Sequence, residues 1–189
     1  MRFLETELPG ARLIYLEPMC DNRGFFSRTF CVQEFAAQAL ETKFVQHSLS
    51  FSAVRGTLRG MHFQTPPHGE VKLVECSKGA IFDVIVDIRP QSPAFRRWQG
   101  FELTAANRRQ LYIPSGFAHG FQTLTADAEV RYLISAFYEP SAARGFRYDD
   151  PAFAISWPLP VTVISGKDRI WPDFGDGPMI RAGSPAAIG

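Results

Sequence analysis

The segment from residue 55 to residue 64 concentrates residue types that can do chemistry. It reads Arg-Gly-Thr-Leu-Arg-Gly-Met-His-Phe-Gln, so that Arg55, Arg59 and His62 lie close together among glycines. Arginine supplies a fixed positive charge, glycine lets the backbone approach another group closely, and an imidazole titrates near neutral pH. Three roles are open for His62: a metal ligand, a proton carrier or a packed core side chain.

A second segment, residues 112–121, contains the pattern Pro-x-Gly-x-x-His and ends just after His119. The pattern resembles the second conserved motif of cupin barrels, in which proline and glycine form a tight turn and the histidine points into the barrel. A metal-binding cupin supplies His-x-His and a glutamate from its first motif, and the matching residues here are His62, Gln64 and Glu70. Because a neutral amide is a poor ligand for a transition metal, we predict no bound metal. The set His62, Glu70 and His119 is kept as the alternative.

The composition excludes several classes of protein. A chain of 189 residues with 46% hydrophobic and 21% charged residues is typical of one soluble globular domain with a sizeable core. A formal net charge of +1 speaks against a nucleic-acid or membrane surface that acts through bulk charge. The N-terminus has no apolar signal segment, and no apolar run approaches transmembrane length. We therefore expect a cytoplasmic protein.

The cysteines point to the same compartment. Cys20, Cys31 and Cys76 are odd in number, widely spaced and without a CxxC pair. This pattern predicts neither a disulfide framework nor a zinc site, and it favours a reducing environment.

Short alternating segments predict a mainly β fold. Strands are expected at residues 11–17, 25–30, 44–51, 71–76, 81–88, 98–103, 109–113 and 129–136. Their spacing of roughly ten residues, with glycine and proline turns between them, favours a sandwich or barrel over βαβ units. Asp83 and Asp87 are four residues apart and therefore share one strand face. Seventeen phenylalanines predict aromatic inner faces.

Two other parts of the chain depart from this pattern. Between Val32 and Thr42 the residues are mostly helix formers, which predicts one short helix. After Pro151 the alternation stops, so we expect a covering tail or short helices, with residues 183–189 as a flexible end.

An ordered set of motifs resembles the dTDP-4-dehydrorhamnose 3,5-epimerase family over about residues 11–174. The motifs occupy residues 21–26, 58–64, 72–74, 82–89, 113–120, 149–152 and 165–168. The resemblance implies a metal-free cupin-type jelly roll with short flanking helices, formed by a single domain over residues 1–189. It also implies a homodimer in which N-terminal segments are exchanged between subunits, and a reaction that needs no cofactor.

The implied substrate is a nucleotide-linked 4-keto-6-deoxyhexose. Its ketone at C4 acidifies the hydrogens at C3 and C5. A base removes one of these hydrogens, an enolate forms, and an acid returns a proton to the opposite face. By similarity to the family, the catalytic residues are the base His62, its paired carboxylate Asp168, the acid Tyr132, the cation Lys72 and the sugar contact His119.

The resemblance also implies the residues that bind the substrate. These are Arg23, Arg59 and Lys167 at the diphosphate, Gln46 near the base or deoxyribose, Tyr138 packed on the base, and Phe26 in the early motif. Taken singly, each arginine would more often be a surface charge, Lys72 a solvated strand lysine, and Tyr132 a strand aromatic.

Departures from the family pattern keep several alternatives open. Arg28 stands where the family commonly has glutamate, and His47 and Ser48 replace an Asp-Asn pair. Both changes lie on the nucleotide side, so CDP- or GDP-linked sugars remain alternatives to dTDP. A single-centre epimerase or a keto-isomerase is a second alternative. A metal-dependent cupin enzyme and a non-catalytic sugar-nucleotide binder are alternatives of a different class. The expected pathway is dTDP-rhamnose or surface-polysaccharide synthesis.

Overall fold

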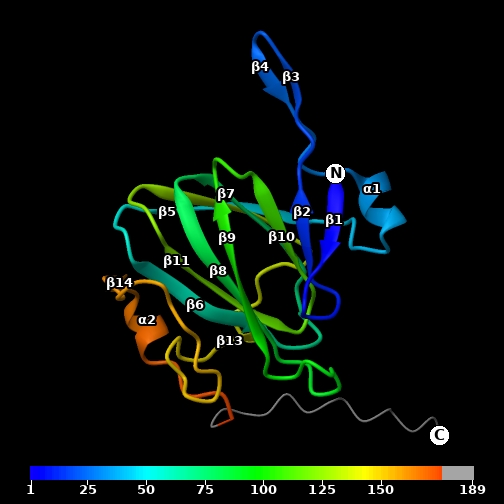
Figure 1. The fold of residues 1–189 in the computed structure, drawn as a ribbon. Coiled ribbons are helices and arrows are strands. Elements are labelled where there is room, and N and C mark those ends of the chain that lie inside the picture. The colour runs from blue at the N-terminus through cyan, green and yellow to red at the C-terminus, as the bar shows by residue number, and fades with distance from the viewer. Residues whose placement is uncertain (176–189) are drawn as a thin grey trace, which may run out of the picture.

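Two β-sheets packed face to face form the body of the protein in this computed structural model, which describes residues 1–175 (Figure 1). In spatial order, sheet I contains β1 (Arg2–Glu5), β2 (Arg12–Tyr15), β10 (Arg109–Ile113), β7 (Lys72–Lys78), β12 (Ala128–Ile134) and β5 (Gln46–Ser52). Sheet II contains β13 (Ala143–Gly145), β6 (Thr57–Gln64), β11 (Phe117–Thr123), β8 (Ala80–Asp87) and β9 (Trp98–Thr104), and β14 (Val163–Ile164) pairs with β6 in parallel. The other pairings within the two sheets are antiparallel across the described residues. The predicted mainly β cupin-type fold is confirmed.

Strand β8 explains why the sequence alternates poorly between Ile81 and Ile88. Ile81 and Ile85 are fully buried in the cluster between the sheets, whereas Val84 and Val86 are fully buried in a second cluster on the outer face of sheet II. A strand covered on both faces needs apolar residues at nearly every position. The charged exceptions, Asp83 and Asp87, share the inner face with Ile81, as the spacing predicted.

The outer faces of both sheets are covered, and this is where most of the clustered phenylalanines lie. Phe63, Phe146 and Phe153 belong to the cluster on sheet II, and partly buried side chains from the last part of the described chain complete it. Those side chains are Ile155, Trp157 and Phe174. The covering tail predicted after Pro151 is therefore confirmed. The prediction that the phenylalanines line the inner faces is wrong for most of them, because the sandwich has apolar layers outside the sheets as well.

Helix α1 (Val32–Ala37) covers the outer face of sheet I. Its Phe35 is fully buried and makes edge-to-face contacts with the neighbouring phenylalanines of the same cluster. The helix is shorter than the predicted Val32–Thr42 segment. Ala39 turns into the left-handed region at φ 55°, and the Leu40 N–H donates to the Phe35 carbonyl. This reversal returns Leu40 to the cluster around Phe35, so packing ends the helix before its sequence does.

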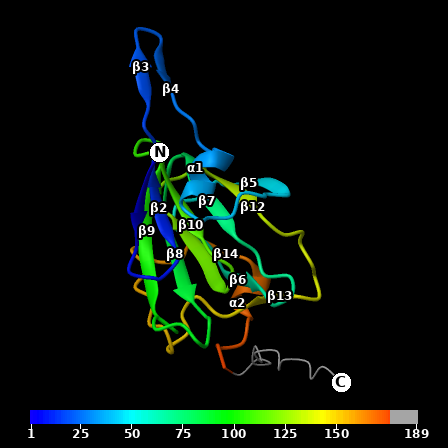
Figure 2. The ribbon, with the colours of Figure 1, turned by 90° about the vertical axis from the view of Figure 1, so that its right-hand side faces the viewer.

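The hairpin of β3 (Met19–Asp21) and β4 (Gly24–Phe26) stands away from the sandwich. Figures 1 and 2 show this projection in two perpendicular views. Its apolar side chains are largely exposed: Met19 by 64%, Phe25 by 49% and Phe26 by 62%. Most of the hairpin surface therefore has no partner within the described chain.

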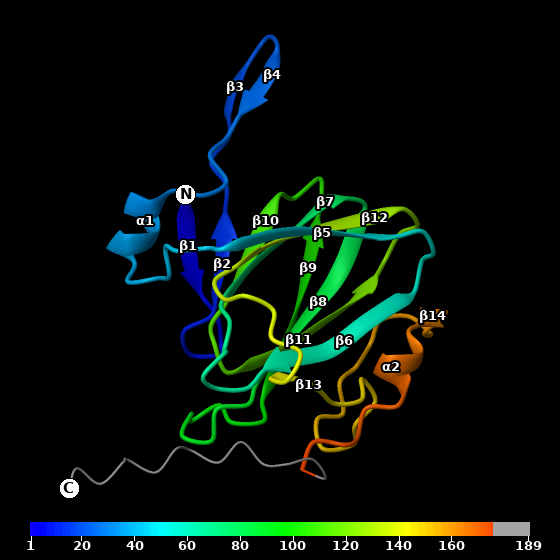
Figure 3. The same ribbon diagram turned by 180° about the vertical axis from the view of Figure 1, so that it is seen from behind.

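Helix α2 (Gly166–Arg169) lies beside β6 and β14 at the other end of the described chain (Figure 3). Ser165 caps it by accepting a hydrogen bond from the Asp168 N–H at 3.0 Å. No helix among residues 1–175 is long and apolar enough to cross a membrane. The flexible end predicted for residues 183–189 lies outside the described residues.

Candidate active site

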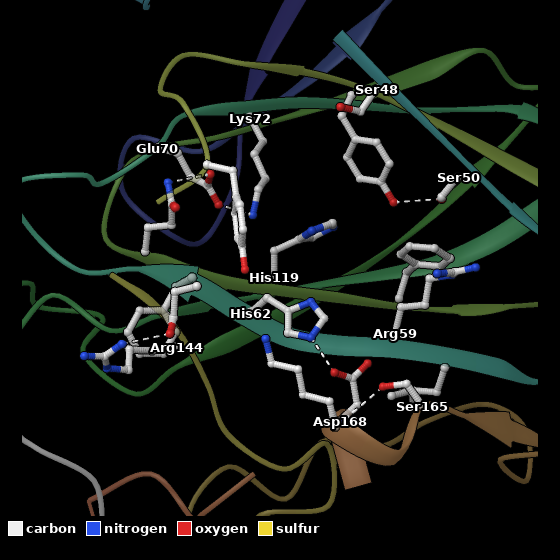
Figure 4. A pocket seen from close by; sticks show the side chains of 18 of the residues that line it. Ser48, Ser50, Arg59, His62, Glu70, Lys72, His119, Arg144, Ser165 and Asp168 are labelled. Carbon is white, nitrogen blue, oxygen red and sulfur yellow. Dashed lines mark hydrogen bonds and ion pairs between the residues drawn. The ribbon is translucent and has the colours of Figure 1, made fainter. Parts of the chain in front are cut away.

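A cavity of about 690 Å³ lies between the sheets, towards the edge formed by β5 and β6. Side chains from β5, β7 and β12 of sheet I face side chains from β6 and β11 of sheet II, and α2 closes one side (Figure 4). All of the predicted site residues except Arg23 and Phe26 line this cavity. They are His62, Tyr132, Asp168, Lys72, His119, Gln46, Arg59, Tyr138 and Lys167.

His62 and Asp168 form a hydrogen-bonded pair on the sheet II wall. The His62 Nε2 lies 2.6 Å from the Asp168 Oδ1, although 106 residues separate them in the chain. The His62 side chain is 44% exposed, whereas the Asp168 side chain is only 6% exposed. Figure 4 shows the bond between the two side chains. The carboxylate therefore lies behind the ring and fixes its orientation, while the ring remains open to the cavity.

Glycines on β6 and β11 make room for this pair. A Cβ on Gly60 would lie 2.6 Å from the Cα of Gly120, and a Cβ on Gly120 would lie 2.6 Å from the Met61 Sδ. The two strands therefore approach more closely here than side chains would allow, and the register of β11 against β6 shifts between His119 and Phe121. The Gly60 N–H then donates to the Asp168 Oδ2 at 3.2 Å.

The environment of Asp168 favours its ionised form. Burial alone raises the pKa of a carboxyl group. For Asp168 the hydrogen bond and charge of His62, together with hydrogen bonds from Gly60 and Ser165, outweigh burial and hold its pKa below the ordinary value. Asp168 therefore stays a carboxylate and acts as a hydrogen-bond acceptor.

A second histidine–carboxylate pair lies deeper in the cavity. The His119 Nε2 is 2.8 Å from the Asp83 Oδ2 and 3.0 Å from the Oδ1. The side chain of His119 is 6% exposed and that of Asp83 is 0% exposed. His119 is also directly opposite His62 across the β6–β11 pair. The two imidazoles are thus neighbours, and each has its own carboxylate.

Tyr132 faces these histidines from sheet I. Its hydroxyl lies 3.1 Å from the Ser50 Oγ, and its ring packs edge-on against the His119 ring at 6.3 Å. Burial raises the pKa of Tyr132 far above that of a free phenol; the Ser50 hydroxyl and the Arg59 charge oppose this shift, whereas the Asp83 charge adds to it. The phenol is therefore fully protonated near neutral pH and can only donate a proton there.

Lys72 enters the cavity from β7 as half of an ion pair. Its Nζ lies 2.7 Å from the Glu70 Oε1, and both side chains are about nine-tenths buried, at 12% and 13% exposed. The Glu70 Oε2 accepts a hydrogen bond from the Gln64 Nε2 at 3.1 Å. The lysine therefore has a fixed position in the wall of the cavity (Figure 4).

The alternative metal set does not fit this geometry. Glu70, the carboxylate of that set, is held in an ion pair with Lys72. Gln64, at the position of a second metal-binding histidine, uses its amide to hold two loops. Within residues 1–175, no group of three or more histidine, cysteine, aspartate or glutamate side chains is placed to hold a metal ion.

Comparison with known proteins decides the family. The family model described as dTDP-4-dehydrorhamnose 3,5-epimerase matches residues 5–176. The chain belongs to this family. It is accordingly an isomerase, as the sequence predicted.

Individual relatives agree with this assignment. A dTDP-4-dehydrorhamnose 3,5-epimerase of Methanothermobacter thermautotrophicus is 43% identical over 182 residues, which cover 94% of this chain and 97% of the relative. The crystal structure of a dTDP-4-dehydrorhamnose 3,5-epimerase from Bacillus anthracis, with TDP and PPi bound, is 40% identical and superposes with a TM-score of 0.89. The superposition covers 92% of this chain and 99% of the Bacillus anthracis chain. A dTDP-4-dehydrorhamnose 3-epimerase of Streptomyces niveus is 38% identical over 170 residues, or 89% of this chain and 82% of the relative.

Around Gln46 and Arg59, the polar groups of the cavity are partly held by the backbone. The Gln46 Oε1 accepts the Tyr138 N–H at 2.9 Å, and the Tyr138 side chain is largely exposed. The Arg59 Nε donates to the Ser52 Oγ at 3.1 Å and its Nη2 donates to the Phe51 carbonyl at 2.8 Å. Arg59 forms no ion pair among the described residues, so its charge is not neutralised.

Lys167 resembles Arg59 in having no ion-pair partner among the described residues. Its Nζ lies 5.1 Å from the centre of the Trp171 ring. Trp171 and Arg144 also line the cavity, and neither was predicted. The Arg144 Nη1 donates to the carbonyls of Ser141 and Ala143. Within residues 1–175, three cations that line the cavity, Arg59, Arg144 and Lys167, therefore have no carboxylate partner.

The structure does not bring Arg23 and Phe26 to the pocket of their own chain. Both lie on the projecting hairpin, and Arg23 is bonded to Asp21 with its side chain 85% exposed. Two of the departures from the family pattern also lie outside the cavity. Arg28 is 3.6 Å from Glu34, and His47 is exposed on β5, whereas Ser48 lines the cavity.

Sequence reasoning missed several residues that the fold brings to the site. Asp83 was placed on a strand face but was not recognised as the partner of His119. Ser50 belongs to the polar strand predicted at residues 44–51, but no local pattern indicates its bond to Tyr132. The only available signal for Asp83 was a carboxylate in an otherwise apolar strand, which requires a buried partner.

Proposed function

We propose that this chain inverts C3 and C5 of a dTDP-linked 4-keto-6-deoxyhexose, with His62 as the base and Tyr132 as the acid. One observation carries this proposal: His62 projects from sheet II and Tyr132 projects from sheet I into the same cavity. Inversion of a carbon centre needs a base on one face and a proton donor on the other. Facing sheets supply these two groups in a fixed arrangement.

In the first step His62 removes the proton at C3 or C5, and the electron pair of the C–H bond moves to the C4 oxygen. Asp168 holds the ring and stabilises the imidazolium that forms. In the second step the enolate carbon takes the phenolic proton of Tyr132 on its opposite face. The carbon is then inverted, His62 carries one extra proton, and Tyr132 is a phenolate.

Lys72 and His119 are assigned to the developing negative charge at the C4 oxygen. A buried ammonium and a ring held by Asp83 both keep their positions while the charge grows, so they stabilise the transition state more than the ketone. Glu70 fixes the ammonium of Lys72. His119, which its buried carboxylate Asp83 orients through Nε2, would donate its Nδ1–H to the C4 oxygen.

Arg59 and Lys167 are assigned to the diphosphate, and Gln46 and Tyr138 to the nucleoside. Their charges and their places in the cavity support this assignment, because a diphosphate favours cations that lack carboxylate partners. The Bacillus anthracis relative holds TDP, which favours dTDP over CDP or GDP. The three cysteines form no disulfide within the described residues, which supports a reducing, cytoplasmic location.

Arg23 and Phe26 are assigned to the pocket of a second copy of the chain. The projecting hairpin supports this, since it exposes Met19, Phe25 and Phe26 together with an arginine. Light scattering should then give a homodimer mass. If the protein is a monomer at micromolar concentration and is fully active, the role of Arg23 and Phe26 at a partner's pocket is wrong.

A single-centre epimerase is the second candidate, because a relative 38% identical is a 3-epimerase. Incubation with dTDP-4-keto-6-deoxyglucose in D₂O, followed by NMR, separates the two. Deuterium at both carbons is expected for the double epimerase, and deuterium at one carbon indicates the single-centre enzyme. Absence of label would overturn both candidates in favour of a binding protein.

The same assay tests the two assigned residues. His62→Ala is expected to abolish exchange at both carbons. Tyr132→Phe is expected to keep some exchange but to impair inversion about 100-fold, since abstraction needs only the base. Normal exchange in His62→Ala would show that another residue is the base.

A further inference from the structure

Two successive inversions on one substrate require both proton carriers to be reset. After the first inversion His62 holds a proton and Tyr132 has lost one, so neither is ready for the second. We propose that Ser50 is the relay through which Tyr132 regains its proton from solvent between the two inversions. This inference rests on the proposed roles of His62 and Tyr132 and adds a residue that those roles do not include.

The geometry singles out Ser50 for this task. Its Oγ is the only hydrogen-bond partner of the Tyr132 hydroxyl among the described residues, at 3.1 Å. In the pairing of β5 with β12, Ser48 lies directly opposite Tyr132, whereas Ser50 lies opposite Val130. The Tyr132 side chain therefore crosses diagonally to Ser50 and passes by Ser48. Both serines line the cavity, and Figure 4 shows the hydrogen bond at Ser50.

The two proton carriers differ in their access to water. The His62 side chain is 44% exposed, so an imidazolium can release its proton directly. The Tyr132 side chain is partly exposed, but its ring packs edge-on against His119 and its hydroxyl is bonded to Ser50, so a phenolate there is less open to water than the His62 ring. Ser50 is partly exposed in the cavity wall and can contact both the phenolate and a water molecule.

The reset step conserves both protons and charge. The Ser50 O–H gives its proton to the Tyr132 phenolate while a water molecule in the cavity gives a proton to the Ser50 Oγ. The hydroxide formed is neutralised by the proton that His62 releases to solvent. Tyr132, Ser50 and His62 then return to their starting states, and no oxidant, reductant or other reactant is consumed.

The test is a quenched single turnover with enzyme in excess, in which NMR measures the ratio of singly to doubly inverted sugar. We expect Ser50→Ala to raise this ratio at least about tenfold, because the second inversion waits for the acid to be reset. Ser48→Ala is the matched control. It deletes a serine hydroxyl from the same face of β5 but leaves the bond between Ser50 and Tyr132 intact, so the ratio should not change. Ser50→Thr keeps the hydroxyl and should restore it.

Three outcomes would overturn the relay. An equal slowing of both inversions in Ser50→Ala would mean that Ser50 only positions Tyr132. An unchanged ratio, or the same rise in Ser48→Ala, would remove Ser50 from the reset. These results differ from a failure of the proposed function: if Tyr132→Phe inverts both carbons normally, Tyr132 is not the acid, whatever Ser50→Ala does.

Discussion

The two histidine–carboxylate pairs of the cavity have the same chemistry but different surroundings. His62 and Asp168 join β6 to the C-terminal segment, and the ring is nearly half exposed. His119 and Asp83 join two central strands of sheet II, and both side chains are almost completely buried. The rings lie opposite each other on paired strands.

This difference separates two functions that one residue type can serve. A base that works repeatedly must exchange protons with water, and the exposed ring of His62 can do so. A group that stabilises charge must keep its position, and burial with a fixed carboxylate provides this for His119. Exposure, more than residue type or partner, therefore distinguishes the proton carrier from the fixed contact.

The largest effect should come from chemical rescue at the two rings. His62→Ala is expected to lower the epimerisation rate about 1000-fold, and added imidazole should restore part of it because the vacated site is open to the cavity. His119→Ala should respond much less to imidazole, because its side chain is almost completely buried beside Asp83. Rates with and without imidazole measure this difference, and His47→Ala, a change at an exposed histidine outside the pocket, is the control. Equal rescue at both positions would contradict the distinction.

The next largest effect is on stability. Asp83→Ala leaves the buried His119 without its partner and should lower the free energy of unfolding by about 3 kcal/mol. Asp168→Ala is the matched change at the other pair and should cost only about 1 kcal/mol, because water can replace the carboxylate at a half-exposed ring. Urea denaturation measures both. If the two losses are equal, burial does not distinguish the pairs in the way proposed.

A smaller effect is expected from a change that keeps the shape of the exposed pair. Asp168→Asn should lower kcat roughly 100-fold with little change in KM, because the amide does not stabilise the imidazolium. Steady-state kinetics measures this loss. Asp149→Asn, at an exposed carboxylate outside the cavity, is the control. A loss confined to KM would instead place Asp168 in substrate binding.

The smallest effect is the pH dependence of stability at Asp168. Its pKa is lower in the folded chain than in the unfolded chain, so the ionised form stabilises the fold. This contribution is fully present above the ordinary carboxyl pKa of about 4 and is lost as the pH falls through the lower folded value. The difference in unfolding free energy between wild type and Asp168→Asn should therefore be constant from pH 7 to pH 5 and shrink in more acidic buffer. A difference that grows on acidification would reverse the assigned sign.

The sequence predicted the mainly β fold because several strands alternate and their turns are marked by glycine and proline. It predicted no strand at β6 or β11, which carry His62 and His119. It predicted less about β8, since a strand buried on both faces loses alternation, and about α1, since Leu40 packs back against Phe35 and ends the helix early. These outcomes depend on long-range packing, which no local pattern records.

For the site, resemblance indicated residues that lie together in the cavity, such as His62 and Asp168, which are far apart in the chain. It could not indicate hydrogen bonds that depend on side-chain direction. The bond of Tyr132 to Ser50 instead of Ser48 follows from a diagonal crossing between strands, and the burial of Asp83 beside His119 follows from the pairing of β8 with β11. Both required the three-dimensional arrangement.

Gln64 limits how easily this scaffold could be engineered into a metalloenzyme. Its Nε2 donates to the carbonyls of His68 and Phe137 and to Glu70, and its Oε1 accepts the Glu139 N–H at 2.7 Å. Replacing Gln64 with histidine to complete a metal-binding triad would remove the hydrogen bonds that connect two surface loops. It would also remove the hydrogen bond to Glu70, the carboxylate that is paired with Lys72. Installing a metal ligand at this position would therefore also require both loops to be rebuilt.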